Sequence, residues 1–229
     1  MFELHRIPEP EVMDDSGEVE AYSSAATQTY LKKLDDTFVE HALRLVNRRE
    51  RGRALDIGMG PGQIVTKLAR TLTRWKFVGI DRSPQMIAEA TANLAAAGPE
   101  LAGRVEFQIA DANALPYPDA TFDLVMCNSV LHHMAEPERL LAEIARVVKP
   151  KGAVLLRDLR RPNRLVYKWH VRRYGGHYSG KMRELYRASV RAAYVISELQ
   201  RLVESSRLNG GRLFNQPKTH IGVERPLSE

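Results

Sequence analysis

Three glycines at alternate positions follow a short apolar run that ends in an acid, in residues 54–63 (ALDIGMGPGQ). Glycine allows a tight turn and lets a ligand approach the main chain, and a helix that starts after such a loop offers free N–H groups to it. The spacing departs from the dinucleotide fingerprint because position 63 is Gln63, and the Gly-Lys-Ser/Thr of a phosphate-binding loop is absent. The loop therefore predicts a ligand site and leaves the ligand open.

Two further acids stand at the ends of the next apolar runs. Asp81 lies 25 residues after Asp56, where a carboxylate suits a ribose diol, although NAD-binding proteins also place an acid there. Asp111-Ala112 ends the third run, and a carboxylate beside a main-chain N–H can recognise the edge of an adenine. Since ligands of doubly wound sheets bind outside the carboxyl ends of the strands, these positions predict an adenosine site without a pyrophosphate. Asp56 is expected to fix the glycine loop by accepting hydrogen bonds from its N–H groups.

The elements that position these residues alternate along the chain. Strands are expected at 53–57, 77–80, 105–109, 122–127 and 153–156, and helices at 20–48, 63–72, 84–97, 137–148 and 196–203. Such alternation is typical of parallel βαβ units. Two last strands, at 211–216 and 219–226, have too short a link for a crossover helix, so they are expected to pair antiparallel. Residues 160–193 are basic and aromatic and are expected to be irregular.

Five segments in this order resemble one family: LDIGMGPG, VGIDRSPQMI, ADANALPYPDATFDLV, LHHM and VVKPKGAVLLRD. They are similar to class I S-adenosylmethionine-dependent methyltransferases, in particular the group that includes the ubiquinone/menaquinone methyltransferases. The resemblance implies a Rossmann-like α/β fold, with seven strands in the order 3-2-1-4-5-7-6, strand 7 antiparallel and helices on both faces. It also implies S-adenosyl-L-methionine as cofactor and S-adenosyl-L-homocysteine as product. We expect residues 49–229 to form this domain, with a basic substrate-side insertion at 160–193, and residues 1–48 to be an arm and helix covering the site.

The resemblance also implies which residues hold the cofactor. These are Gly58, Met59, Gly60, Gly62, Asp81, Arg82, Met86, Asp111, Ala112 and Asn128. The glycine loop would pass under the methionine part, Asp81 would hold the ribose hydroxyls and Met86 would pack on the adenine. Asp111 would hold the adenine edge, and Asn128 would meet the amino-acid end. Met59 departs from the family pattern, where a small residue or cysteine is usual, and only a change in loop packing is expected from it.

Methyl transfer from a sulfonium needs alignment and a dry pocket more than a covalent residue. A hydroxyl acceptor adds the need for a general base. His133, His177 and Asp158 are the candidates by location, while the pair His132-His133 can equally shape the wall of the site. No other His or Cys falls at metal-ligand spacing, so no metal site is expected.

The net charge of +6 is a local feature. Residues 157–191 hold eleven Arg or Lys against two acids, whereas residues 1–20 hold seven acids and one arginine. The basic segment is interpreted as a solvated helical surface, a lid over an acidic or aromatic substrate, or a patch for nucleic acid or a membrane surface. The acidic arm is expected to fold back over the pocket, with Tyr22 near the cofactor.

Together these observations predict methyl transfer to a small-molecule acceptor, aromatic or acidic, by in-line displacement. The alternatives are an RNA methyltransferase that uses residues 157–191, a non-catalytic adenosylmethionine-binding protein, and an NAD-dependent oxidoreductase. A single cysteine, Cys127, the absence of a signal-peptide pattern and the absence of an apolar run long enough for a membrane span predict a cytoplasmic protein.

Overall fold

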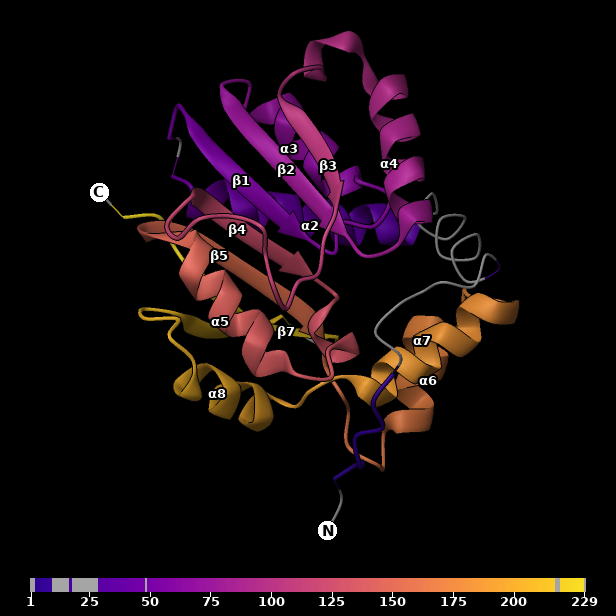
Figure 1. Ribbon diagram of the computed structural model, residues 1–229. Helices are drawn as coiled ribbons and strands as arrows, with labels where there is room; N and C mark the ends of the chain where they lie inside the picture. Colours follow the sequence, from indigo (N-terminus) through magenta and orange to yellow (C-terminus); the bar gives the residue numbers. More distant parts are fainter. Residues whose placement is uncertain (1–2, 10–16, 18–28, 48, 217–218, 229) are drawn as a thin grey trace.

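A seven-stranded sheet in the order β3-β2-β1-β4-β5-β7-β6 forms the centre of the protein (Figure 1). The computed structural model describes residues 3–9, 17, 29–47, 49–216 and 219–228. The strands are β1 (Gly52–Ile57), β2 (Trp75–Asp81), β3 (Val105–Ile109), β4 (Phe122–Asn128), β5 (Val148–Leu159), β6 (Arg212–Gln216) and β7 (His220–Arg225). Strands β1 to β5 pair in parallel, and β7 is antiparallel to both β5 and β6. The predicted strand order and the antiparallel last pair are confirmed.

Helices cover both faces of the sheet. On one face lie α2 (Thr29–Leu45), α3 (Gln63–Thr71) and α4 (Pro84–Ala97), around a core that contains the fully buried Phe38 and Trp75. On the other face lie α5 (Pro137–Val147) and α8 (Ile196–Ser205). The residues described include no helix long and apolar enough to cross a bilayer.

Helix α4 shows how local sequence sets these elements beside the sheet ends. Its N-cap Ser83 accepts a hydrogen bond from the N–H of Met86, and Pro84 occupies the first helical position, where its missing N–H costs nothing. Gly98, with a φ of 127°, ends the helix. The first turn of α4 is therefore fixed next to Asp81, the last residue of β2.

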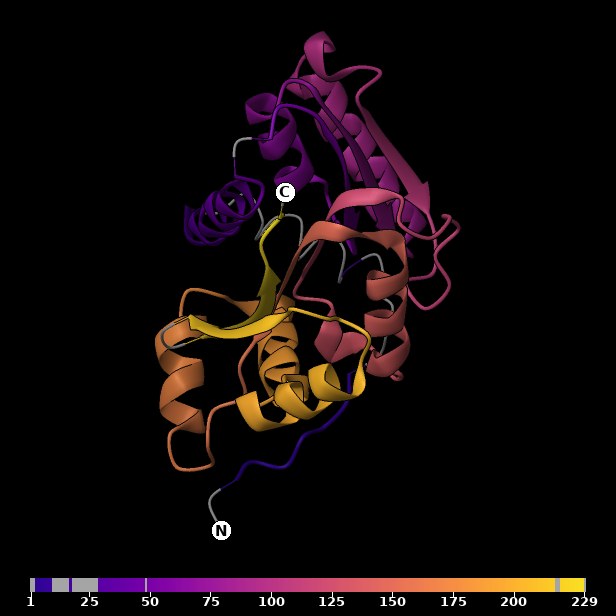
Figure 2. The same ribbon diagram turned by 90° about the vertical axis from the view of Figure 1, so that its left-hand side faces the viewer.

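The prediction of an irregular segment at 160–193 is wrong. Two helices, α6 (Tyr167–Gly175) and α7 (Gly180–Ala192), occupy it, and they lie with α8 at the end of the molecule away from α4 (Figure 2). One face of α7 is apolar enough to be buried, with Leu185 and Val190 on it. The many arginines, which are compatible with the exposed face of a helix, concealed this periodicity.

Candidate functional site

The glycine loop follows β1, and its backbone adopts a conformation that is unfavourable for residues with a side chain. Gly58, Gly60 and Gly62 have φ values of 66°, 52° and 75°, in the left-handed region that only glycine enters without cost. A Cβ added at Gly58 would lie 2.4 Å from a methyl carbon of Val130. The loop therefore passes close under the β4 side of the site with its main chain exposed to the cavity above it.

Asp81, and not Asp56, fixes this loop. The N–H of Gly60 donates to Asp81 Oδ2 at 2.9 Å, and the N–H of Ser83 donates to Asp81 Oδ1 at the same distance. Asp56 Oδ2 is buried and has no hydrogen-bond partner among the described residues. The expectation that Asp56 holds the loop is therefore wrong. The loop N–H of Gly60 is instead bound by Asp81, at the end of the neighbouring strand β2.

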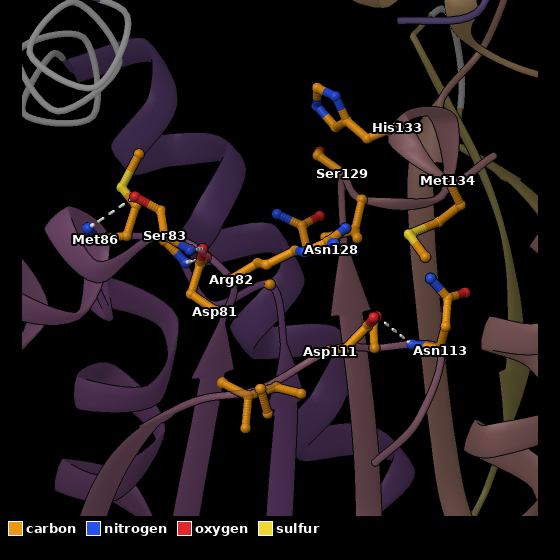
Figure 3. A pocket seen from close by; sticks show the side chains of 16 residues that line it. Asp81, Arg82, Ser83, Met86, Asp111, Asn113, Asn128, Ser129, His133 and Met134 are labelled. Atoms are coloured by element: carbon orange, nitrogen blue, oxygen red, sulfur yellow. Dashed lines mark hydrogen bonds between the residues drawn. The ribbon is translucent and has the colours of Figure 1, made fainter. Parts of the chain in front are cut away.

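One cavity at the carboxyl ends of β1, β2 and β4 collects most of the predicted cofactor residues (Figure 3). Those that line it are Gly58, Gly60, Asp81, Arg82, Met86, Asp111, Ala112 and Asn128. Met59 instead points into the core beneath the loop, and Gly62 is the N-cap of α3, facing Phe107. The sequence patterns did not point to several other lining residues, among them Ser83, Asn113, Ser129, Val130 and Met134.

The far end of this cavity fits an adenine. Asp111 Oδ1 accepts a hydrogen bond from the N–H of Asn113 at 2.9 Å, which folds the loop after β3 into a turn. Asn113 Oδ1 is buried, finds no partner in the described parts of the chain, and can accept a hydrogen bond from an amino group of a base. Apolar contact comes from Met86, which is 4% exposed, and from Ile80. The spacing of two residues after Asp111 is the sequence signal that could have found Asn113.

The near end fits an amino acid. A smaller hollow, continuous with the cavity through Gly58 and Asn128, is lined by Asp35 of α2 and Asp56 of β1. Burial raises the pKa of Asp56 to about 8, assisted by the nearby charges of Asp35 and Asp81, and burial raises the pKa of Asp35 to about 6. A nearby cation stabilises the charged form of such buried carboxyl groups. This end of the cavity therefore suits the ammonium group of a methionine moiety.

A second cavity adjoins the first. The two share Asn128, Ser129 and His133. Apolar and aromatic side chains of α2 and α7, with one from the turn before α7, wall the second cavity: Leu31, Leu34, Tyr178, Met182, Leu185 and Tyr186. Arg157, His132 and His220 supply polar groups. If each cavity held a ligand, the two ligands would come together at these three shared residues.

Asp158, a predicted candidate, lies against His132 and holds it from two directions. Both side chains are almost fully buried, and Asp158 Oδ1 accepts from His132 Nδ1–H at 2.6 Å. Asp158 Oδ2 accepts from the main-chain N–H of His132 at 2.8 Å. Burial lowers the pKa of His132, but the Asp158 and Glu9 carboxylates outweigh burial and raise it above 6.5. His132 lines the second cavity, and its Nε2 has no hydrogen-bond partner within the residues that the structure describes.

Residues 55–156 match the family described as a methyltransferase domain. The chain is 31% identical over 136 residues to the ubiquinone/menaquinone biosynthesis C-methyltransferase UbiE of Geobacter sulfurreducens, which covers 59% of the chain and 52% of the relative. Over residues 55–156 the chain is therefore similar to methyltransferase domains, in agreement with the expected class I S-adenosylmethionine-dependent family. It is also 36% identical over 129 residues to the 27-O-demethylrifamycin SV methyltransferase of Amycolatopsis mediterranei, covering 53% of the chain and 46% of that enzyme.

The chain has the same fold as a solved protein from Methanococcus maripaludis. The TM-score is 0.73 at 16% identity, over 97% of the chain and 98% of the solved protein. The chain spans about half the length of the curated relatives it matches. The likeness therefore covers the cofactor half of the site, and the acceptor half has to be argued from the residues of this chain.

The other two candidate bases, His133 and His177, are placed differently. His133 lines both cavities, and its ring lies 4.1 Å from that of His132. His177 lies exposed in the link between α6 and α7, with its ring 4.0 Å from the Tyr178 ring and tilted by 50° to it, and lines neither cavity. The structure thus brings together His132, His133 and Asp158, and leaves His177 outside.

Glu9 joins the two histidines from the N-terminal arm. Its Oε2 lies 3.9 Å from His132 Nε2 and 4.0 Å from His133 Nδ1, and the three residues form a group of metal-ligand types within the described parts of the chain. Bound zinc would hold such atoms about 3.3–3.5 Å apart, given Zn–N and Zn–O distances of about 2.0–2.2 Å. The spacing in this structure, 3.9 Å and 4.0 Å, is wider than that of ligands around a bound zinc ion. Although burial opposes them, the Asp158 and Glu9 carboxylates raise the pKa of His132.

The described part of the arm runs along α7. Arg6 Nε donates to Ala192 O at 2.7 Å, and the guanidinium lies 4.3 Å from the centre of the Tyr194 ring. The N–H of Ile7 donates to Arg191 O at 3.1 Å. These contacts place residues 3–9 beside the second cavity. Tyr22, which we expected near the cofactor, lies outside the described residues.

Replacement of Asp56 by Asn is expected to stabilise the fold at about pH 7, by about 1–3 kcal/mol, and to have little effect at about pH 4. The folded pKa of about 8 exceeds the ordinary 3.8, so folding takes up a proton and stability falls as pH rises between these values. The amide removes that cost at nearly the same volume. Urea unfolding at both pH values measures it, with the exposed Asp119→Asn as control. Equal destabilisation at both pH values would contradict the prediction.

Proposed function

We propose that this protein transfers the methyl group of S-adenosylmethionine to a hydroxyl group of a small aromatic molecule. The observation that carries the proposal is the junction of the two cavities at Asn128, Ser129 and His133. The first cavity fits the cofactor at both ends, and the second is walled by aromatic and aliphatic side chains of α7. An acceptor in the second cavity would present its reacting atom at the junction.

The bound cofactor supplies a methyl group on a positively charged sulfur, which is already an excellent leaving group. The protein's own contribution is alignment, which can lower a barrier by about 7–11 kcal/mol. The carboxyl groups of Asp81 and Asp111 fix the nucleoside end, and the apolar wall formed by Leu31, Leu185 and Tyr186 excludes water from the acceptor. No covalent residue is required.

A hydroxyl acceptor has to lose its proton, and His132 is the group we assign to receive it. Its Nδ1–H is committed to Asp158, so the neutral ring presents Nε2 as the acceptor of a proton. Since the pKa of His132 is raised, the neutral form becomes more abundant as the pH rises above 6.5. Methyl transfer should therefore increase with pH over that range.

Residues 1–48 complete the acceptor site in this proposal. Leu31, Leu34 and Asp35 of α2 line the second cavity, and residues 3–9 lie along α7. The arm and α2 would form one side of the acceptor site, and α7 from the basic segment would form the other. The acceptor would be enclosed by segments that lie outside the matched domain.

Calorimetry with S-adenosylmethionine, S-adenosylhomocysteine and NAD tests the cofactor. We expect saturable heat with the first two and none with NAD. Transfer of an isotopically labelled methyl group to phenols, quinols, small acids and RNA, followed by mass spectrometry, tests the acceptor. Labelled phenol or quinol ethers support the proposal. Binding of NAD alone would overturn the cofactor assignment, and label in RNA or on acids alone would overturn the acceptor class.

Asp81→Asn is expected to weaken binding of S-adenosylhomocysteine about 10–100-fold. Both oxygens of Asp81 accept main-chain N–H groups, and an amide nitrogen in place of one oxygen cannot accept. Either the Gly60 loop is released or the contact to the ribose is lost. Titration calorimetry measures the Kd, with Asp119→Asn as the exposed control. A Kd within about threefold of the wild type would show that Asp81 does not hold the nucleoside.

A further inference from the structure

Large apolar side chains are exposed together on the surface of α6 and the start of α8. Among the described residues, six large hydrophobic side chains are exposed, and four of them belong to this surface: Leu165, Val166, Trp169 and Ile196, at 69%, 42%, 60% and 40%. Val166, Trp169 and Ile196 line one surface hollow. Exposed apolar residues gathered in this way mark a binding surface more often than scattered ones do.

The same surface is strongly basic. Between Asp158 and Glu184 the sequence contains no acid and eight Arg or Lys. Arg164, Lys168, Arg172 and Arg173 are exposed on α6 and the turn before it. Glu198 and Glu3 face the buried Arg161, which lines the hollow, at 2.7 Å and 4.0 Å. Within the part of the chain that the structure describes, no acid forms an ion pair with Arg164, Lys168, Arg172 or Arg173.

We propose that this face, formed by Leu165, Val166, Trp169 and Ile196 with the four cations of α6 and its preceding turn, docks the protein on an anionic phospholipid surface. Cations attract acidic headgroups, while tryptophan and aliphatic side chains enter the boundary between headgroups and acyl chains. Three of the four apolar groups are aliphatic. Single-stranded nucleic acid is bound by cations together with aromatic side chains on which bases stack, so leucine, valine and isoleucine favour lipid over RNA.

The docking face lies against the wall of the acceptor cavity. Helix α6 packs on α7 through Tyr167, Val171 and Tyr174, which contact the cluster of Tyr178 and Tyr186. Those two tyrosines line the acceptor cavity on their other side. If the proposed function holds, the acceptor reaches this cavity from the lipid and is itself lipophilic.

Tryptophan fluorescence provides a direct measurement, because the chain contains two tryptophans and Trp75 is fully buried. The full-length protein is mixed with vesicles of phosphatidylcholine, with or without phosphatidylglycerol, without cofactor or acceptor. We expect a blue shift and co-sedimentation with the anionic vesicles only, lost at high salt. Failure here leaves the methyl-transfer proposal intact, since that proposal is tested by calorimetry and labelling.

The variants separate the apolar from the ionic part of the face. Leu165→Ser and the pair Arg172→Gln with Arg173→Gln should each weaken vesicle binding about tenfold or more. The control is Ile109→Ser, which removes an equally exposed residue outside the face. Circular dichroism verifies that each variant is folded. Absence of binding to anionic vesicles at low salt overturns the proposal, as does binding to an RNA oligonucleotide that the same variants abolish while vesicles give no signal.

Discussion

Asp158→Asn is expected to reduce the rate of methyl transfer about 10²–10⁴-fold while binding of S-adenosylhomocysteine stays unchanged. Asp158 Oδ1 accepts from His132 Nδ1–H and from the N–H of Leu159, both at 2.6 Å. An amide at this position cannot stabilise the imidazolium that forms when the ring takes a proton. It also permits the other tautomer, in which Nε2 carries the hydrogen and cannot accept one.

The pH profile distinguishes this positioning role from a general loss of structure. Burial raises the pKa of Asp158, but His132 and the N–H donors outweigh burial and lower it. The pKa of His132 is raised, so the rate of methyl transfer by the wild type should increase with pH above 6.5. In Asp158→Asn that rise should move to lower pH while the maximum falls. Titration of the His132 ring by nitrogen NMR reports the same shift without an acceptor.

The control for this prediction is His177→Asn, which alters a histidine outside both cavities. Its rate and pH profile should match those of the wild type. If Asp158→Asn retains full activity, or loses activity with an unchanged pH profile, the assignment of His132 as the proton acceptor is wrong.

The ion pair also contributes to stability, with a defined sign. His132 has a raised pKa, so its contribution is complete below 6.5 and is lost as pH rises through the folded value. Asp158 has a lowered pKa, so its contribution is complete above 3.8 and is lost as pH falls through the folded value. The pair therefore stabilises the fold most between these two ordinary values. Asp56 also has a raised pKa, from 3.8 to about 8, so it too lowers the stability of the fold as the pH rises between these values.

The cofactor half of the site could be predicted because its signals are local. Each of Asp81 and Asp111 directly follows an apolar run in the sequence, and parallel strands bring their carboxyl ends to one edge. The strand order followed from the resemblance, and the antiparallel last pair from a short link. One prediction in this half was wrong: we expected Asp56 to hold the glycine loop, but Asp81 holds it. The choice between the two depends on the distance of each carboxylate from the loop, which the sequence does not give.

The acceptor half could not be predicted because its contacts are distant in sequence. Asp158 and His132 are 26 residues apart and meet through the pairing of β4 with β5, in which Asn128 lies opposite Arg157. Glu9 reaches the histidines from the other end of the chain. No periodicity encodes such pairings, so His133, the next residue along, was the candidate from the sequence. The helices α6 and α7 were missed because arginine content outweighed their apolar spacing.

Arg157→Met is expected to lower the free energy of unfolding by about 2–4 kcal/mol. The guanidinium is buried and ties three elements together: it donates to Asn128 Oδ1 and Thr37 Oγ1, each at 2.9 Å, and to Leu34 O at 3.2 Å. Burial lowers its pKa to about 10, against the pull of Asp35 and Asp158. Methionine fills similar space and removes the cost of burying a charge, but Asn128 Oδ1 and Thr37 Oγ1 lose the guanidinium as donor, while Leu34 O keeps the Thr37 hydroxyl.

The lost hydrogen bonds decide the sign, because a hydrogen bond to a charged group contributes about 1.5–3 kcal/mol. The loss should also release α2, so cofactor binding should weaken through Asn128 and Asp35. Urea unfolding measures the stability, and Arg74→Met is the matched control, since its pair with Glu50 is exposed and contributes at most about 1 kcal/mol. An Arg157→Met variant as stable as Arg74→Met would show that α2 is held by apolar packing around Phe38 alone, and that the acceptor cavity does not depend on this cation.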